Sequence, residues 1–541
     1  MVPQADRKLF TPVQIGPTTL QHRVVMAPLT RSRSEQPGDI PGNLMVEYYS
    51  QRASDGGLII SEATTISIAG RGWYGAPGMY SGEQVAGWEK VVDAVHAKGG
   101  RMFSQLWHTG RSAHVDLRNG ATPAAPSVVP SYWLDATPII STPSGWLKPS
   151  PHRALDIAEI PGIIEDYRRA AERAKSAGFD GVELHAANGY LLDEFLQDGS
   201  NHRTDAYGGS VENRSRLLLE VVGALASVWG GDRVGVRIGP GGTWNSMSDS
   251  DPTAHFDYVA EQLNRFGLAY LHIIEPRVKG NVVIADGQDA VAAERLRKIF
   301  KGKIIAAGGF EPDTAEAVVE KGDADAVAFG RHFVSNPDLP KRIQLGLPLN
   351  EYDRKTFYTF DFHGYTDYPF YDQKRDGSLS DPFCPQLQNS DFYFDSRLHA
   401  GVAQASAISS PRAESKNKAL VLEAFDTLFN KRDYEAAERY WSPDYIQHSA
   451  HIAPGRDGLF NLIKSAPPSL RYEPGTILAE NDFVIVHGRF SSMGRPANWI
   501  AADILRISDG VLVEHWDVLQ DEATRESSES GRPMFGDTFG A

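Results

Sequence analysis

Three hydrogen-bonding side chains lie close together in Gly181–Arg214, a stretch that reads GVELHAANGYLLDEFLQDGSNHRTDAYGGSVENR. His185, Asn188 and Tyr190 follow an apolar, strand-like run and precede a helical one. Polar groups packed this densely behind a buried strand cost free energy unless they find partners. Ligands of α/β proteins bind at the carboxyl ends of strands, so we take this stretch as the candidate active site. In the alternative, protein groups satisfy His185 and Asn188, and their role is structural.

The elements that must position these residues repeat along the chain. From residue 20 to about 345, an apolar strand-like run followed by a helical stretch occurs eight times. The runs are rich in Val and Ile and barely alternate, which is typical of parallel strands buried on both faces. We therefore predict a TIM barrel, an α/β fold. A doubly wound sheet is the alternative, but no G-x-G-x-x-G follows the first run. The predicted strands are 23–28, 57–64, 101–107, 181–187, 234–240, 270–276, 303–309 and 326–331.

Glycines end two of these strands, and one of them is followed by an arginine. Gly308-Gly309 ends the seventh strand and Gly330-Arg331 the eighth, where barrels often bind phosphate. Arg237 lies in the fifth strand. Together these residues indicate a phosphorylated cofactor, although the glycines could form tight turns and Arg237 could belong to an internal ion pair.

Residues 121–153 form a long, proline-rich insertion after the third predicted strand. An insertion at this point lies on the catalytic face of a barrel, so it could form a lid. Composition alone favours a surface loop equally.

A second domain follows the barrel. Residues 373–415 are polar and irregular and read as a linker, and residues 416–541 read as helices followed by an antiparallel meander, an α+β domain. In the predicted strand 498–508, Asp503 shares an apolar face with Trp499 and Leu505, so burial should raise its pKa. We predict that other titratable side chains join Asp503 in a pocket: His448, His487, His515 and Asp517.

Composition excludes several classes of protein. The formal charge of −15 and the absence of a basic run argue against nucleic-acid binding. The single cysteine, Cys384, cannot form an internal disulfide and fits a reducing compartment. The start of the chain has no apolar signal region and no apolar run is long enough to span a membrane, so a cytoplasmic protein without membrane contacts is expected.

Six sequence motifs, found in the expected order along the chain, indicate that the barrel resembles a known family. HAANGYLLDEFLQDGSNHRTDAYGGSVENR, with VVMAPLTRSR, FSQLWHTGR, VGVRIGP, FGRHFVSNPDL and KTFYTFDFHGYTDYP, resembles the old yellow enzyme family of FMN-dependent ene-reductases over about residues 8–372. The resemblance implies FMN as cofactor, NADPH or NADH as co-substrate and a small enone as substrate. It also makes a substrate role for His185 and Asn188 the better interpretation.

The resemblance further assigns roles to individual residues. It implies that His185 and Asn188 bind the carbonyl oxygen of the enone, hydride reaches the β-carbon from the flavin, and Tyr190 gives the proton to the α-carbon. The implied substrate pocket includes Trp107, Phe357 and Tyr358. The implied flavin site consists of Ala27, Pro28, Leu29, Thr30, Ala63, Gln105, Arg237, Gly308, Gly309, Gly330 and Arg331. A redox-neutral isomerase is the alternative, but relatives that isomerise lack the tyrosine that is present here as Tyr190.

The second domain resembles the SnoaL-like, NTF2-like cone through DYIQHSAHIAPGRDG and VEHWDV. The resemblance implies either a cyclase or isomerase that removes an acidic C–H proton, or a non-catalytic module for binding or homodimer formation. A metal site of His448, His451 and His515 is the alternative, but the spacing of the first two fits no specific metal motif, so we predict no metal site.

Overall fold

The computed structural model describes residues 7–137, 139–280, 282–283, 291–371, 411–449, 452–480, 482–492, 497–528, 530–536 and 538–539. The chain divides into two compact units, residues 1–384 and 385–541. The predicted linker lies outside the described residues as far as residue 410. No helix within the described ranges is long and apolar enough to cross a membrane.

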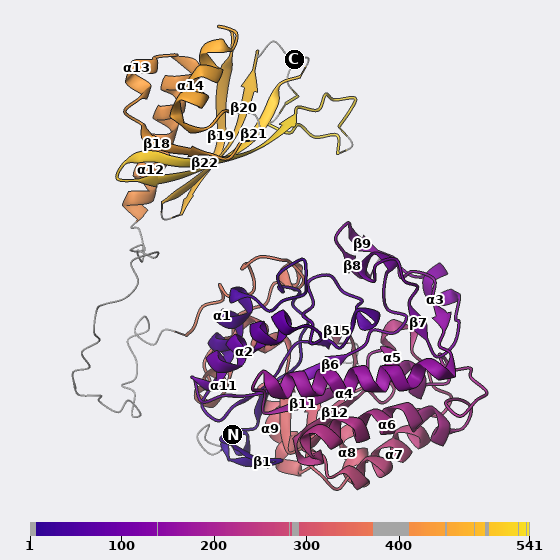
Figure 1. The fold of residues 1–541 in the computed structure, drawn as a ribbon. Coiled ribbons are helices and arrows are strands. Elements are labelled where there is room, and N and C mark those ends of the chain that lie inside the picture. The colour runs from indigo at the N-terminus through magenta and orange to yellow at the C-terminus, as the bar shows by residue number, and fades with distance from the viewer. Residues whose placement is uncertain are drawn as a thin grey trace, which may run out of the picture. The chain divides into compact units, whose positions relative to one another are not determined.

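Eight parallel strands close into a barrel in the first unit (Figure 1). They follow one another in chain order around the barrel, and the pairings of β17 with β3 and of β6 with β11 complete the ring. The TIM-barrel prediction is therefore confirmed, and each predicted strand overlaps one strand of the barrel. The barrel strands are β3 (Val24–Met26), β4 (Leu58–Ile60), β6 (Arg101–Trp107), β11 (Gly181–Ala186), β12 (Val234–Ile238), β13 (Tyr270–Ile274), β16 (Ile304–Ala307) and β17 (Ala326–Phe329).

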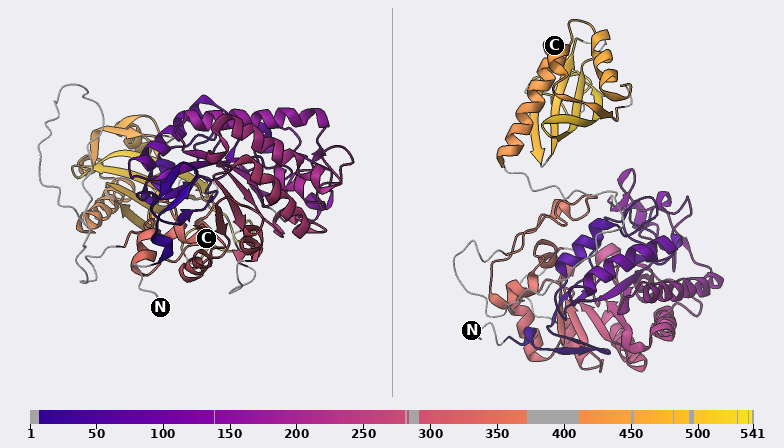
Figure 2. Two further views of the ribbon diagram at one scale, coloured as in Figure 1. Left: turned by 90° about the horizontal axis from the view of Figure 1, so that it is seen from below. Right: turned by 60° about the vertical axis from the view of Figure 1, so that its left-hand side comes forward.

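Helices surround the strands (Figures 1 and 2). In α4 the buried residues recur every three or four positions, and a capping box of Asp156 and Glu159 begins the turn that leads into it. The helices of this unit are α1 (Asn43–Arg52), α2 (Gly82–His96), α3 (Ser131–Leu134), α4 (Ile160–Ser176), α5 (Leu191–Leu196), α6 (Val211–Trp229), α7 (Pro252–Leu263), α8 (Val291–Arg297), α9 (Pro312–Lys321), α10 (Arg331–Ser335) and α11 (Leu339–Leu345).

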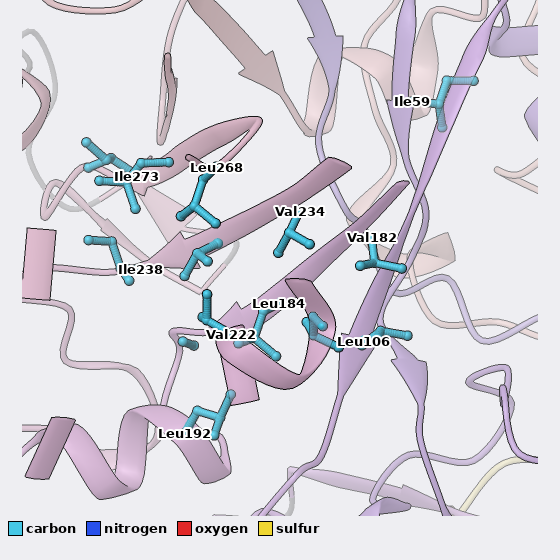
Figure 3. Close-up of a cluster of buried hydrophobic side chains, with 14 of the residues drawn as sticks. Ile59, Leu106, Val182, Leu184, Leu192, Val222, Val234, Ile238, Leu268 and Ile273 are labelled. Atoms are coloured by element: carbon cyan, nitrogen blue, oxygen red, sulfur yellow. The ribbon is translucent and has the colours of Figure 1, made fainter. Parts of the chain in front are cut away.

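Alternation along the strands separates the core from the site. In β11, Val182 and Leu184 belong to the hydrophobic core between strands and helices, with Leu192 of α5 and Val222 of α6 (Figure 3). Glu183 and His185 therefore point to the other face, into the barrel. A second apolar cluster fills part of the interior and includes the hairpin of β1 (Val13–Ile15) and β2 (Thr18–Leu20). The barrel interior is therefore packed with apolar side chains of this second cluster. Polar side chains such as Glu183 and His185 occupy the rest of the interior.

The proline-rich insertion has secondary structure of its own. A hairpin of β8 (Ile140–Thr142) and β9 (Gly145–Leu147) lies at the end of the unit opposite β1 (Figure 1). Two short parallel strands, β7 (Ala124–Ala125) and β10 (Arg153–Ala154), pair where the insertion begins and ends.

The second unit packs helices on one five-stranded sheet. The strand order is β18-β22-β21-β20-β19, antiparallel except for the parallel pair β18 and β22. Its elements are α12 (Pro411–Phe425), α13 (Tyr434–Ala437), β18 (Trp441–Gln447), α14 (Gly455–Ser465), β19 (Arg471–Glu480), β20 (Phe483–Ser491), β21 (Trp499–Ser508) and β22 (Val511–Asp521). The predicted meander is confirmed. Helix α13 ends at Ala437, and Trp441 and Tyr445 are buried in the core from strand β18.

Candidate active site

A cavity of about 340 Å³ opens at the carboxyl ends of the barrel strands. It collects all but one of the barrel residues that the sequence analysis selected. These are Ala27, Pro28, Leu29, Thr30, Ala63, Gln105, His185, Asn188, Tyr190, Arg237, Gly308, Gly309, Gly330, Arg331, Phe357 and Tyr358. Residues from most of the barrel strands and the segment after the last barrel helix thus meet at one place.

Trp107 is the exception, and its prediction as a pocket residue needs correction. Its side chain is 1% exposed and is not among the residues that line the cavity. The indole packs edge-on against the ring of Tyr190, with 4.8 Å between centroids. Trp107 therefore supports the cavity wall from behind.

A tight turn after β11 presents the three residues of the opening motif. Asn188 and Gly189 both have left-handed backbones, with φ of 60° and 68°. A Cβ at Gly189 would lie 2.6 Å from the Cβ of Asn245, so only glycine fits there. The Asn188 carbonyl accepts a hydrogen bond from Asn245 Nδ2 at 2.9 Å. The turn is thus held against Asn245 by packing and by a hydrogen bond, and α5 begins directly after Tyr190.

His185 is a neutral hydrogen-bonding group in this site. Burial lowers its pKa well below the ordinary value, and the positive charge of Arg237 lowers it further. Its Nδ1 is buried and has no hydrogen-bond partner among the described residues. A buried, unpartnered nitrogen beside a cavity indicates a place for a ligand atom.

Tyr190 stands edge-on to His185, with 5.1 Å between ring centroids. Burial raises the pKa of its hydroxyl above the ordinary value. The hydroxyl therefore keeps its proton at neutral pH, as a proton donor must before it acts.

A polar network lies on the interior face of four neighbouring strands. Gln105 Nε2 donates to Glu183 Oε1 at 2.7 Å, and His272 Nδ1 lies 2.8 Å from Glu183 Oε2. Burial lowers the pKa of His272, so the neutral ring donates. The pKa of Glu183 is lowered in spite of burial, because His272, Arg237 and Gln105 all favour its carboxylate. The sequence analysis missed Glu183 and His272, although their alternation with Val182 and Leu271 could have indicated them.

Arg237 brings a positive charge to the cavity. Its side chain is partly exposed there, and its buried Nε has no hydrogen-bond partner among the described residues. Burial lowers its pKa, while the negative charge of Glu183 opposes that change most strongly. A guanidinium with unused donors suits an acceptor group of a ligand.

Glycines form another part of the lining. Gly308 and Gly309 have φ of 109° and 68°. A Cβ at Gly308 would lie 3.2 Å from the backbone nitrogen of Glu275, and one at Gly330 would lie 3.2 Å from Leu29. Close backbone approach beside Arg331 is the arrangement that binds a phosphate group. The unpartnered Arg237 nitrogen and this glycine lining together fit FMN.

An aromatic wall closes the cavity, and most of it was not predicted. Trp73 and Trp146 pack edge-on with 5.5 Å between centroids, and Tyr358 lies 5.1 Å from Trp73. Trp146 belongs to β9, and Ile139 of the same insertion also lines the cavity. The insertion is therefore part of the site, which favours the lid over the surface loop. Trp244 also lines the cavity and was missed.

Two buried arginines hold the segment that carries Phe357 and Tyr358. Arg31 Nε donates to the Phe357 carbonyl at 3.1 Å, and Arg33 Nη1 donates to the same oxygen at 3.0 Å. Arg33 also reaches the carbonyl oxygen of His363. The LTRSR motif after β3 thus fixes one wall of the cavity.

The second unit contains a smaller titratable cluster on the inner face of its sheet. His515 Nε2 lies 3.0 Å from Asp503 Oδ1, and His515 Nδ1 lies 3.0 Å from Gln447 Oε1. Burial raises the pKa of Asp503, as predicted. Carboxylate and imidazole atoms of Asp503, His515 and Asp517 lie within 4.8 Å of one another.

His448 and His487 do not join this cluster, so that part of the prediction is wrong. His487 pairs with Ala502, one residue from Asp503, and strand alternation places it on the opposite face. His448 bonds Glu514 at 2.9 Å and stacks on Trp516, both on that outer face. His451 lies outside the described residues. Gln447 was missed, since a strand over 441–447 was not foreseen.

Comparison with known proteins agrees with the motifs. A profile of the NADH:flavin oxidoreductase / NADH oxidase family matches residues 8–350, and a SnoaL-like domain profile matches 421–515. The 12-oxophytodienoate reductase 1 of Oryza sativa subsp. japonica is 47% identical over 372 residues, which are 68% of this chain and 93% of that protein.

Solved structures give the same result. A morphinone reductase in complex with tetrahydroNAD is 49% identical, with a TM-score of 0.63, over 68% of this chain and 99% of that one. An old yellow enzyme homologue from Zymomonas mobilis is 43% identical, with a TM-score of 0.63, over 67% and 99%. These similarities confirm the resemblance drawn from the six motifs, and the SnoaL-like profile confirms the one drawn for the second domain.

Proposed function

The chain belongs to the NADH:flavin oxidoreductase / NADH oxidase family, and from that premise we propose that its barrel is an ene-reductase. The proposed reaction is the reduction of the C=C bond of an α,β-unsaturated carbonyl compound, with NADPH or NADH as the source of electrons. Residues 1–372 would form the reductase and residues 416–541 a separate domain.

FMN is the cofactor of this family, and the cavity offers groups suited to each part of it. Gln105 and Arg237 would hold the pyrimidine end of the flavin, and Thr30 would hydrogen-bond its C4 carbonyl. The strand-end residues Ala27 to Leu29 and Ala63 would contact the ring system. Gly308, Gly309, Gly330 and Arg331 would hold the phosphate. When bound, FMN supplies the hydride that reduces the alkene.

The neutral imidazole of His185 beside Asn188 is the observation that carries this proposal, since its Nδ1 has no hydrogen-bond partner in the part of the chain that the structure describes. Both side chains line the cavity, and both can donate a hydrogen bond to a carbonyl oxygen. Such donors stabilise the negative charge that develops on this oxygen when the β-carbon is reduced. Tyr190 would then pass its proton to the α-carbon, and the saturated carbonyl compound leaves.

The decisive measurement compares NADPH consumption with product. The purified full chain, with a simple cyclic enone under anaerobic conditions, should consume one equivalent of NADPH for each saturated ketone formed. An isomerised product with no net loss of NADPH would instead support the redox-neutral isomerase. Retention of the proton donor Tyr190 supports net reduction.

For the second unit we propose proton transfer by Asp503 and His515. Gln447 Oε1 accepts the Nδ1–H of His515, which leaves Nε2 to share a proton with the buried carboxyl group of Asp503. Ser449 N–H also donates to Gln447 Oε1, so the amide orientation is fixed. A pair that shares one proton suits the removal of an acidic C–H proton in a cyclase-like or isomerase-like reaction.

A binding or dimerisation module is the second candidate, and the outer face of the same sheet supports it. Leu478, Ile485, Ile504 and Trp516 lie in register across four strands and form an apolar row. Leu478 is 60% exposed and Ile485 is 42% exposed. A second copy of the chain could cover this row.

Two substitutions distinguish the candidates for the second unit. Asp503→Asn removes the proton-sharing carboxyl group and leaves the outer face intact, so it should change the products but not the molecular mass in solution. Ile485→Arg should lower a dimeric mass to the monomeric one and leave the products unchanged. Light scattering and product analysis on the full chain measure both.

A further inference from the structure

Three side chains from neighbouring barrel strands, Gln105, Glu183 and His272, form a hydrogen-bonded network beneath the cavity, and the charge of Arg237 lies close enough to Glu183 to be influenced by it. Gln105 and Glu183 are direct neighbours in the pairing of β6 with β11, and Arg237 and His272 are neighbours in the pairing of β12 with β13. Glu183 and His272 are fully buried, whereas Gln105 and Arg237 line the cavity. Gln105 is also buried at 1% exposure, but as a cavity-lining residue it can meet a ligand, as can Arg237.

Glu183 determines how Gln105 is oriented. A carboxylate only accepts hydrogen bonds, so the 2.7 Å contact with Glu183 Oε1 must be made by the amide nitrogen of Gln105. The amide oxygen is then directed away from Glu183. Without this carboxylate, the amide could rotate by half a turn and exchange its donor for its acceptor.

His272 in turn prevents Glu183 from moving. Its Nδ1–H donates to Glu183 Oε2 at 2.8 Å, so both carboxylate oxygens are occupied. The side chain is therefore clamped between β6 and β13. Two hydrogen bonds from opposite sides restrict the rotation of the carboxylate, which one contact alone would permit.

Glu183 also places a negative charge near Arg237. Among the groups around Arg237, Glu183 has the largest electrostatic influence in favour of the charged guanidinium. Arg237 lines the cavity, and its Nε has no hydrogen-bond partner within the described ranges. Glu183 therefore destabilises any negative charge that develops in the cavity, whereas Arg237 stabilises it. Both effects are strong because little solvent reaches these groups.

We propose that Glu183 is a positioning residue of the flavin site: it orients Gln105 and, through its charge, limits how strongly Arg237 favours reduced over oxidised flavin. This inference rests on the proposed placement of the flavin over Gln105 and Arg237. A purely structural hydrogen bond between Glu183 and His272 is the alternative.

Glu183→Gln in the FMN-bound full chain tests the electrostatic part. Glutamine retains an acceptor for Gln105 but loses the charge, so the flavin should become easier to reduce. At a fixed potential set by a reference dye, the ratio of reduced to oxidised flavin should rise roughly tenfold. Glu316→Gln is the matched control: it removes another buried carboxylate, outside the cavity, and should leave the ratio unchanged.

Glu183→Asp tests whether Glu183 orients Gln105. It also keeps the proposal testable if the Glu183→Gln variant does not fold. Aspartate keeps the charge but is too short to hold Gln105, so the reduction ratio should stay within about threefold of the wild-type ratio. FMN should dissociate several-fold more readily, and fluorescence of released FMN measures this. Unchanged FMN affinity in Glu183→Asp, or an unchanged ratio with a lower melting temperature in Glu183→Gln, would overturn the proposal.

Variants of the proposed flavin contacts separate this inference from the placement it rests on. Gln105→Ala and Arg237→Met should both shift the reduction ratio. If they do and Glu183→Gln does not, the role of Glu183 is refuted and the flavin placement stands. If none of the three changes the ratio, the placement itself is wrong.

Discussion

The rings of His185 and Tyr190 meet edge-on at 5.1 Å, so the proposed oxyanion donor and the proposed proton donor share one wall of the cavity. Both groups are held in their uncharged forms by burial, which lowers the pKa of His185 and raises that of Tyr190. Neither needs to change protonation state before the substrate binds.

Tyr190→Phe should slow the oxidation of reduced enzyme by an enone about 10²–10⁴-fold, because the proton donor is lost. Reduction of the enzyme by NADPH should be unchanged, since that step needs no proton from Tyr190. Stopped-flow absorbance separates the two half-reactions. An equal slowing of both would show that the substitution disturbs the fold of the cavity.

The double variant His185→Ala with Asn188→Ala should abolish enone reduction while FMN stays bound. Loss of each donor removes about 3 kcal/mol of transition-state stabilisation. Turnover of NADPH with oxygen should persist, because oxygen has no carbonyl group to be polarised. Measured enone reduction at the wild-type rate would show that other groups bind the carbonyl oxygen.

Gly308→Ala should weaken FMN binding by about tenfold or more. The added Cβ meets the Glu275 backbone at 3.2 Å, and the φ of 109° is strained for alanine. Gly322→Ala is the control, because its φ of 86° is also left-handed but no atom lies within 4 Å of the new Cβ. Both variants should lose stability, and only Gly308→Ala should release FMN in ultrafiltration.

Trp146→Ala should change the preference among enones without changing reduction by NADPH in the first half-reaction. The indole of Trp146 lines the cavity and is 46% exposed, so its loss should widen the entrance and favour bulky enones several-fold in kcat/KM. Trp133→Ala in the same insertion is the control, since Trp133 packs on His152 and does not line the cavity. Equal effects of the two would point to general loosening of the insertion.

Glu194→Gln should make the stability of the barrel depend less on pH, between pH 5 and pH 8, than it does in wild type. Burial raises the pKa of Glu194 to about 8, so the folded state prefers the protonated acid. This contribution is fully present below the unfolded pKa of about 4.5 and is lost as the pH rises through about 8. Glutamine can still accept the hydrogen bond from the Arg111 backbone N–H but does not ionise. The melting temperature of wild type should fall between pH 5 and pH 8, and that of the variant should fall by several degrees less. Identical pH profiles would refute the raised pKa.

The sequence was sufficient to predict the barrel and most of its cavity residues, because one pattern, the apolar run with polar interruptions, indicates both. Runs such as 181–187 are apolar enough to mark strands, and their polar interruptions mark the residues that face the cavity. Trp73, Trp146 and Trp244 were missed since they lie outside the barrel strands, where no periodicity relates a side chain to a direction. Alternation with Val182 and Leu271 could have marked Glu183 and His272 as interior residues, but their contact with each other joins β11 to β13 and depends on barrel closure.

In the second unit the errors came from strand faces. His487 and Asp503 are both polar residues in strands, and only the pairing of Val486 with Asp503 reveals that His487 lies on the other face. Gln447 was missed because β18 includes Pro443 and reads poorly as a strand.

The insertion of residues 121–153 contributes Ile139 and Trp146 to the cavity, whereas Gln105, His185 and Arg237 come from strands whose other face is barrel core. A one-residue insertion in those strands would turn the reactive side chains into the core and the core into the cavity. The insertion of residues 121–153 is not subject to this constraint of strand alternation. If the proposed function holds, the range of substrates can therefore be changed by exchanging this one segment while the strand residues of the site stay in place.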